Sequence, residues 1–164
     1  MSVPIIIYTD GAALGNPGPG GYGAVLMQAN HRKEISGGFR RTTNNRMELL
    51  AVIMALKQIK STQLSIQVYT DSKYVCDAIE KKWVFSWKQK GWKKIKNVDL
   101  WQVFLPLYAL LKPNFNWVKG HSGITENEFC DVLATTAAKN NPMEIDHNYE
   151  TYETLEKNLG GLNL

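Results

Sequence analysis

The chain has 164 residues, of which 44% are hydrophobic and 21% are charged, so its length and composition fit one globular domain with a sizeable core. No run approaches the roughly 18 apolar residues of a membrane span, and the apolar start lacks a basic leader, so we expect a cytoplasmic protein. The formal charge of +4 is modest, and the two cysteines, Cys76 and Cys130, are too few for a disulfide scaffold or a zinc site, which predicts buried thiols.

The first predicted elements are three strands. A β-branched, apolar run over 3–9 predicts a central strand that ends at Asp10. A loop rich in glycine and proline follows over 11–21, and the runs 22–28 and 32–39 then predict an antiparallel hairpin. We therefore expect Asp10 at the end of a strand.

A helix and a further strand carry two more acids. The apolar pattern over 43–60, with threonines and asparagines at its start, predicts a helix that holds Glu48 in its first turns. The run 64–70 predicts a strand that is followed by Asp71, and both this strand and the first one read Tyr-Thr-Asp at the end. The two aspartates should therefore meet at one edge of the sheet, where α/β folds place their ligands.

A predicted helix over 72–82 opens a strongly basic segment. Eight lysines stand against two acids over 73–96, a local charge of +6, so a polyanionic partner should meet this part of the chain. The segment also contains Trp83, Trp87 and Trp92. We rank packing within a short helical pair above stacking on nucleic-acid bases as their role.

The remaining predicted elements are a helix, a strand and a helix, over 99–111, 114–119 and 126–139. Thr125 and Glu128 fit a capping box at the start of the last helix, which carries Asp131 one turn further on. From residue 144 onward five acids stand against one lysine, and we expect this tail to be a poorly packed, solvated extension.

Four carboxylates are the candidates for chemistry, those of Asp10, Glu48, Asp71 and Asp131. Each alone has an ordinary explanation, as a turn former after a strand or as a solvated helix position. Their expected convergence favours a metal site, because hard divalent ions such as Mg²⁺ prefer carboxylate and water oxygens. Two ions about 4 Å apart could activate a water and stabilise the leaving oxygen of a phosphodiester.

Several strings around these residues resemble bacterial type 1 ribonuclease H, in order over about residues 3–140. They are Tyr-Thr-Asp-Gly-Ala at 8–12, Gly-Asn-Pro-Gly-Pro-Gly-Gly at 15–21, Thr-Thr-Asn-Asn-Arg-Met-Glu-Leu at 42–49, Tyr-Thr-Asp-Ser at 69–72, Gly-Trp-Lys at 91–93, Lys-Asn-Val-Asp-Leu-Trp at 96–101, Val-Lys-Gly-His-Ser-Gly at 118–123, Glu-Asn-Glu at 126–128 and Cys-Asp at 130–131. The resemblance implies the α/β ribonuclease H-like fold, a five-stranded mixed sheet with helices on both faces. It implies a catalytic domain over 1–142, with a basic protrusion at about 81–97, and an acidic C-terminal extension over 143–164.

The resemblance also implies an activity. The chain should be an endonuclease that hydrolyses the RNA strand of RNA–DNA hybrids, leaves 3′-hydroxyl and 5′-phosphate ends, and removes RNA primers and R-loops. Its cofactor should be two Mg²⁺ ions, with Mn²⁺ as the alternative: Asp10 bridges both ions, Glu48 and Asp71 complete the site of one, and Asp131 helps to hold the other. His121 matches a histidine on a mobile loop that moves protons or assists product departure. We expect a monomer.

Substrate contacts follow from the same resemblance. Asn16, Asn44 and the backbone near Gly11 should touch the RNA strand, whose 2′-hydroxyl distinguishes it from DNA. Thr43 and Asn45 should grip a phosphate of the DNA strand, with little base readout. Further contacts with the duplex should come from the basic segment, through Lys82, Trp83, Lys88, Lys90, Lys93 and Lys94.

The sequence departs from the family pattern near two of these positions. Lys73 stands where many bacterial relatives have a glutamine that contacts RNA, so discrimination there is either weaker or taken over by a charge contact. Ile124 and Thr125 replace a His-Pro pair that is common after the loop histidine. Neither departure affects a predicted metal ligand.

Two other functions could use similar residues. A proofreading exonuclease or a strand transferase also uses an acidic cluster, but the exonuclease would carry Asp-x-Glu on its first strand, where this chain has Asp10-Gly11-Ala12. A catalytically idle module that binds hybrids through its basic segment would lack at least one carboxylate, whereas all four are present.

Overall fold

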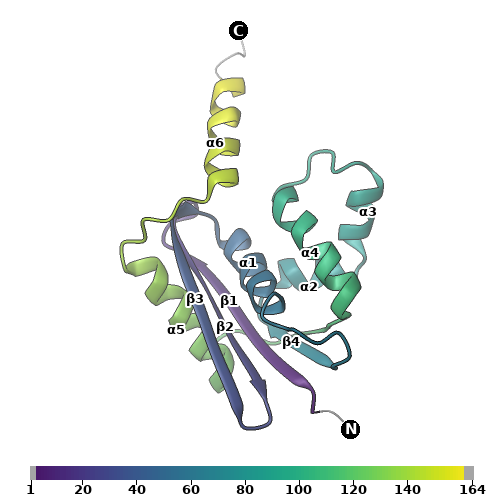
Figure 1. Ribbon diagram of the computed structural model, residues 1–164. Coiled ribbons are helices and arrows are strands. Elements are labelled where there is room, and N and C mark those ends of the chain that lie inside the picture. Colours follow the sequence, from purple (N-terminus) through teal and green to yellow (C-terminus); the bar gives the residue numbers. More distant parts are fainter. Residues whose placement is uncertain (1–2, 161–164) are drawn as a thin grey trace.

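A computed structural model describes residues 3–160 of the protein (Figure 1). One five-stranded mixed sheet has the strand order β3-β2-β1-β4-β5, with β1, β2 and β3 antiparallel and β1, β4 and β5 parallel. The strands are β1 (Ile5–Ala13), β2 (Gly18–Gln28), β3 (His31–Thr42), β4 (Ile66–Thr70) and β5 (Asn114–Trp117). The helices are α1 (Asn44–Leu56), α2 (Lys73–Glu80), α3 (Trp83–Gln89), α4 (Val98–Leu111), α5 (Thr125–Lys139) and α6 (His147–Gly160).

Helices cover both faces of the sheet, as the sequence predicts. α5 packs on β1, β2 and β3, and α1 packs on β1 and β2 and against α4 (Figure 1). Side chains such as Ile7, Leu49 and Val68 fill the core with no exposed surface. Both cysteines are free and buried, which confirms the predicted thiols. In the described part of the chain, no helix has the length and apolar character needed to cross a membrane.

β1 is longer than the sequence predicts. It continues to Ala13, so Asp10 pairs with Gly23 of β2, while the pairing of β1 with β4 ends at Thr9. Asp10 therefore lies inside β1 and not at its end as predicted. The predicted loop over 11–21 is too long, because only residues 14–17 connect the two strands. Its glycines build strands because α5 packs directly on the backbone: a Cβ atom at Gly21 would lie 2.3 Å from an α5 carbonyl oxygen.

The tryptophans of the basic segment have two different environments. Trp87 meets Trp101 of α4 edge-on, with ring centroids 6.0 Å apart, and Trp92 packs against the same core. The predicted packing role is confirmed for these two. It is wrong for Trp83, which is 43% exposed and carries the Lys81 ammonium 5.1 Å from its ring centroid.

One prediction about the last helices is also wrong. α5 already includes Thr125, so the predicted capping box does not form; instead the Glu128 carboxylate accepts a hydrogen bond from the Gly123 N–H at 3.1 Å. The tail forms the helix α6, none of whose described side chains is buried, in keeping with a poorly packed extension, and buried Asp146 ties its start to the domain. The terminal residues 1–2 and 161–164 of the two predicted regions lie outside the described residues.

Candidate active site

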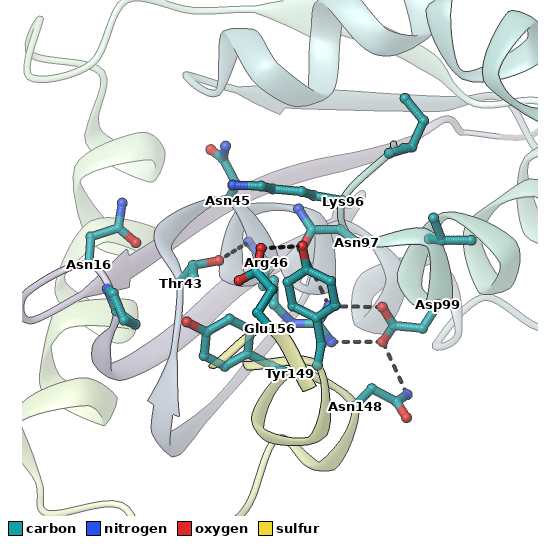
Figure 2. Close-up of a pocket in the computed structure, with 14 residues that line it drawn as sticks. Asn16, Thr43, Asn45, Arg46, Lys96, Asn97, Asp99, Asn148, Tyr149 and Glu156 are labelled. Atoms are coloured by element: carbon teal, nitrogen blue, oxygen red, sulfur yellow. Dashed lines mark hydrogen bonds and ion pairs between the residues drawn. The ribbon is translucent and has the colours of Figure 1, made fainter. Parts of the chain in front are cut away.

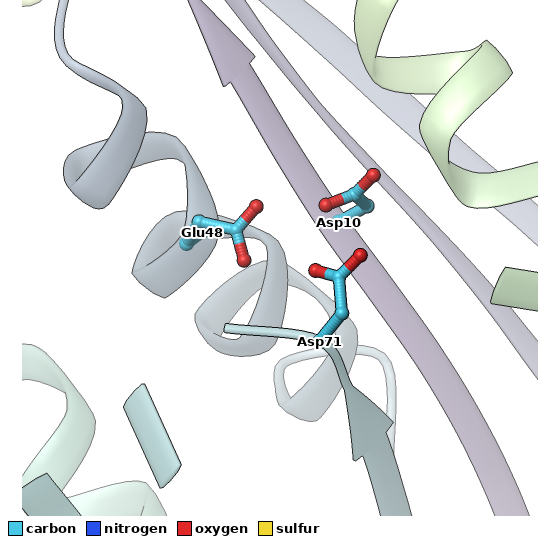
Figure 3. A group of neighbouring side chains, drawn as sticks. All are labelled: Asp10, Glu48 and Asp71. Carbon is cyan, nitrogen blue, oxygen red and sulfur yellow. The ribbon is translucent and has the colours of Figure 1, made fainter. Parts of the chain in front are cut away.

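Three of the four predicted acids converge. One carboxylate oxygen from each of Asp10, Glu48 and Asp71, here called the acidic trio, lies within 4.8 Å of the others. Figure 3 shows the three side chains pointing toward one another from β1, α1 and the end of β4. Thr9 and Thr70 are partners in the parallel register, so the aspartates that follow them leave the paired region side by side.

Gly11 lets α1 approach β1 closely enough to bring Glu48 into the trio. A Cβ atom at Gly11 would lie only 2.2 Å from the backbone nitrogen of Glu48, so a larger residue would push the helix away. The Gly11 N–H donates hydrogen bonds to the carboxylates of Glu48, at 2.7 Å, and of Asp10, at 2.9 Å. One glycine therefore both spaces and orients two of the acids.

The trio is poorly suited to carrying its full negative charge alone. Burial raises the pKa of Asp10 to about 7, and the charges of Asp71 and Asp131 add to this rise. Burial and the neighbouring Asp10 carboxylate raise the pKa of Glu48 well above its usual range. Glu48 Oε2 is buried without a hydrogen-bond partner among residues 3–160. Clustered carboxylates with an unused buried oxygen fit a hard divalent cation, which would supply the missing positive charge.

The raised pKa of Asp10 predicts how stability changes with pH in the absence of metal. Between pH of about 4 and about 7 the folded chain holds a proton that the unfolded chain has released, so the free energy of unfolding falls as pH rises through this window. The fall should be about 1–4 kcal/mol, at about 1.4 kcal/mol per pKa unit. Denaturant unfolding in EDTA at a series of pH values measures it. Asp10→Asn should flatten the curve, and parallel curves for the two proteins would contradict the assignment.

The fourth predicted acid, Asp131, lies outside the close group. It stands in the second turn of α5, half-buried, and its charge reaches Asp10 strongly enough to contribute to the raised pKa there. The structure thus brings Asp131 near the trio without placing it inside.

His121 lies on the exposed loop between β5 and α5, which runs along Asp71. A Cβ atom at Gly120 would lie 2.7 Å from Asp71 Oδ2, and Trp117 donates its indole N–H to the Asp71 carbonyl oxygen at 3.0 Å. His121 itself is exposed and has a left-handed φ of 54°. Sequence reasoning missed Trp117, whose only signal is its place directly before the motif at 118–123.

A cavity of ≈ 480 Å³ lies at the start of α1 (Figure 2). It is lined by Asn16, Thr43 and Asn45, three of the predicted substrate contacts, and also by Lys96 and Asn97, which sequence reasoning did not single out. The sequence did offer a signal for these two residues, because both belong to the family motif Lys-Asn-Val-Asp-Leu-Trp at 96–101. The lining offers amide, hydroxyl and ammonium groups, which suit a phosphate oxygen.

Two further residues predicted to contact substrate, Asn44 and Lys73, interact with neighbouring side chains. The Asn44 N–H donates to Asn16 Oδ1 at 3.1 Å, which fixes the loop before β2 to the start of α1. The Lys73 ammonium lies 4.8 Å from the ring centroid of Trp117, so its charge is held close to the loop that contacts Asp71.

The basic protrusion is formed by α3 and the turns that follow it (Figure 1). All of its predicted contact lysines are exposed: Lys82, Lys88, Lys90, Lys93 and Lys94. The protrusion therefore presents positive charge to solvent while its inner tryptophans hold it on the core.

The geometry defines a class of protein: an α/β fold that gathers carboxylates from a helix and from the point where two parallel strands cease to pair is suited to metal-dependent hydrolysis of phosphate esters. Comparison with known proteins gives the family. The model of the RNase H family matches residues 3–139, and the chain belongs to that family.

Relatives and solved structures agree with this assignment. A ribonuclease H of Rippkaea orientalis is 50% identical over 151 residues, which cover 89% of this chain and 92% of that protein. One of Desulforamulus reducens is 52% identical over 147 residues, covering 87% and 92%. The crystal structure of LC9-RNase H1, a type 1 RNase H, has a TM-score of 0.77 at 34% identity and covers 86% of this chain and 74% of its own. LC11-RNase H1, solved in complex with RNA/DNA hybrid, has a TM-score of 0.59 at 26% identity, with coverage of 82% and 96%.

Proposed function

We propose that the chain is a ribonuclease H that hydrolyses the RNA strand of RNA–DNA hybrids with two Mg²⁺ ions, leaving 3′-hydroxyl and 5′-phosphate ends. The observation that carries the proposal is the acidic trio, in which Asp10 and Glu48 are buried and one Glu48 oxygen has no hydrogen-bond partner among residues 3–160, in a chain of this family. The hybrid complex of LC11-RNase H1 supports the choice of substrate. Within the proposal the enzyme works as a monomer in the cytoplasm, on RNA primers and R-loops, and its catalytic domain ends at about residue 142.

The four carboxylates and His121 would have different roles in the reaction. Asp10, whose pKa is raised by the charges of both Asp71 and Asp131, would help to hold both ions, Glu48 and Asp71 would complete one site, and Asp131 would help to hold the second. When bound, divalent ions supply an activated water and stabilise the departing oxygen of the phosphodiester. His121, on the loop beside Asp71, would move a proton at that departing oxygen or assist its release.

Substrate binding would use surfaces on both sides of the trio. Thr43 and Asn45, in the cavity at the start of α1, would hold a phosphate of the DNA strand. Asn16, Asn44 and the backbone near Gly11 would contact the RNA strand, and so would Lys73, whose ammonium over the Trp117 ring stands in place of a neutral side chain. The groove would read duplex shape with little selection of base sequence.

The exposed lysines of the protrusion should control affinity and its dependence on salt. A variant with Lys90→Gln, Lys93→Gln and Lys94→Gln should bind hybrid more weakly, and the slope of log K against log salt should shrink by about 0.9 for each phosphate that is no longer neutralised. Fluorescence anisotropy with labelled hybrid in EDTA measures both quantities. Lys139→Gln, at the far end of α5, is the matched control and should leave the slope unchanged. An unchanged slope in the triple variant would remove these lysines from the binding surface.

The proposed activity is tested by incubating the protein with a hybrid, duplex DNA and duplex RNA of one sequence. We expect cleavage of the RNA strand of the hybrid alone, only with Mg²⁺ or Mn²⁺ present. Cleavage that persists in EDTA, or that falls equally on all three duplexes, would overturn the proposal.

A further inference from the structure

The tail helix α6 follows the part of the chain that the family model matches, yet charged side chains tie it to the end of β3. Glu150 accepts two hydrogen bonds from Arg40, of 3.0 and 2.9 Å, and Glu153 accepts two from Arg41, both of 2.8 Å. None of the described α6 side chains is buried. Charge, more than apolar packing, therefore holds α6 where Figure 1 shows it.

A bulge explains how two neighbouring arginines reach the same helix. The register between β2 and β3 shifts between Gly18 and Gly20, which are opposite Thr42 and Phe39, so β3 carries an extra residue at this point. A bulge of this kind interrupts the alternation of side chains and re-aims them. Successive arginines can therefore both turn toward α6.

One of the two ion pairs is joined to the lining of the cavity at the start of α1. Tyr149 lines this cavity and donates its hydroxyl to Glu153 at 3.2 Å, and Glu156 of the same helix also lines it (Figure 2). Arg41 stands two residues before Thr43, one of the proposed contacts with the DNA strand. Through Glu153 and Tyr149, the Arg41 guanidinium is thus joined to the lining of a site proposed to hold phosphate.

The other ion pair lies at a separate hollow. Arg40 and Glu150 line a pocket of ≈ 370 Å³ together with His147 and Leu155. Neither pair lines the cavity that holds Thr43, but Glu153 is hydrogen-bonded to Tyr149, which does line it, whereas the side chains of Arg40 and Glu150 bond only to each other among the described residues. The same helix therefore makes two similar pairs, of which one is joined to the cavity lining and the other is not. This contrast provides a matched control.

We propose that α6 is an intramolecular acidic competitor, in which Glu153 occupies Arg41 and withholds it from the backbone phosphates of the hybrid. The inference rests on the proposed function for the identity of the duplex. Glu153 accepts from Nε and Nη2 of Arg41, a parallel pair of donors that could otherwise receive two phosphate oxygens. A bound duplex must therefore displace Glu153 before it gains Arg41.

The competition is weak enough to be reversed by substrate. The Arg41 side chain is 41% exposed, and ion pairs of such exposure contribute little to stability. The start of α6 stays attached to the domain when Glu153 releases Arg41, because Asp146 accepts hydrogen bonds from Thr42 Oγ1 and Arg46 Nε, both at 2.8 Å. α6 thus lowers affinity and salt sensitivity without closing the site.

The test is the binding of labelled hybrid in EDTA over a series of salt concentrations, with Glu153→Gln compared against Glu150→Gln. Both variants remove one negative charge from α6, but only the first frees the arginine whose ion pair is joined to the cavity lining. We expect Glu153→Gln to bind roughly two- to fivefold tighter at low salt. Its slope of log K against log salt should steepen by about 0.9, the value for one additional neutralised phosphate. Glu150→Gln should keep the parent slope.

A third variant shows whether Arg41 causes the gain. Combining Glu153→Gln with Arg41→Gln should return both affinity and slope to the parent values. Equal changes in the two glutamine variants, or a gain that survives the loss of Arg41, would overturn the inference. A separate assay tests the proposed function. If that function is wrong, the parent protein does not cleave the hybrid in Mg²⁺, whatever the binding measurements in EDTA give.

Discussion

Asp10→Asn should lose hybrid cleavage by roughly three orders of magnitude while still binding the duplex. Asp10 lies in β1 as a member of the trio, and its N-terminal neighbour Thr9 is paired to β4. The amide keeps the shape of the side chain but removes the charge proposed to bridge two cations. Binding should persist because the exposed lysines of the protrusion are untouched. Single-turnover cleavage in Mg²⁺ and anisotropy in EDTA measure the two effects.

The matched control for this substitution is Asp77→Asn. Asp77 lies on α2 with its side chain 32% exposed, paired to Lys81 at 3.6 Å, and it is not a member of the trio. Its amide variant should cleave hybrid at close to the parent rate. Full activity of Asp10→Asn, or an equal loss in both variants, would remove Asp10 from the proposed chemistry.

Arg46→Met should lower the free energy of unfolding by about 3–5 kcal/mol, because it leaves the buried carboxylate of Asp146 and the half-buried one of Asp99 without their cation. The Arg46 side chain is 5% exposed and donates to Asp99 at 2.8 and 2.7 Å and to Asp146 at 2.8 and 3.0 Å. This one residue of α1 therefore joins α4 to the start of α6. Denaturant unfolding measures the loss, and a loosened α6 should appear as faster proteolysis within 143–160.

Arg40→Met is the control for removal of a charge at the surface. Its pair with Glu150 is exposed, and pairs of that kind contribute little. We expect its unfolding free energy to stay close to that of the parent. An Arg46→Met protein that is equally stable would show that the buried network is not needed to hold the tail.

The acids were predictable because local and topological signals agree. Asp71 follows a short β-branched run. The Tyr-Thr dipeptide that precedes both Asp10 and Asp71 indicates two equivalent strands, and these strands do pair in parallel. Glu48 follows from the helical pattern after Thr43, which caps α1 by accepting from the Arg46 N–H at 3.3 Å. The family strings then added roles that spacing alone could not assign.

The errors share a physical cause, which is dependence on contacts distant in sequence. The glycines at 18, 20 and 21 look like a loop until β2 is known to pair with β1 and β3, and Gly21 to lie against the backbone of α5. The helix of the tail and its ion pairs could not be predicted from composition, because the acids meet Arg40, Arg41 and Arg46 only after folding. Trp117 had no pattern of its own, since its hydrogen bond to Asp71 crosses from β5 to the end of β4.

Calorimetric titration of Mg²⁺ into the metal-free protein tests most directly whether the acidic trio holds cations. Below pH of about 7 the buried acids hold a proton, so ion binding should release it, and the measured heat should change with the ionisation enthalpy of the buffer. Asp10→Asn should weaken the binding strongly. Ion binding that releases no proton and is unchanged in Asp10→Asn would contradict a divalent site built on Asp10, Glu48 and Asp71.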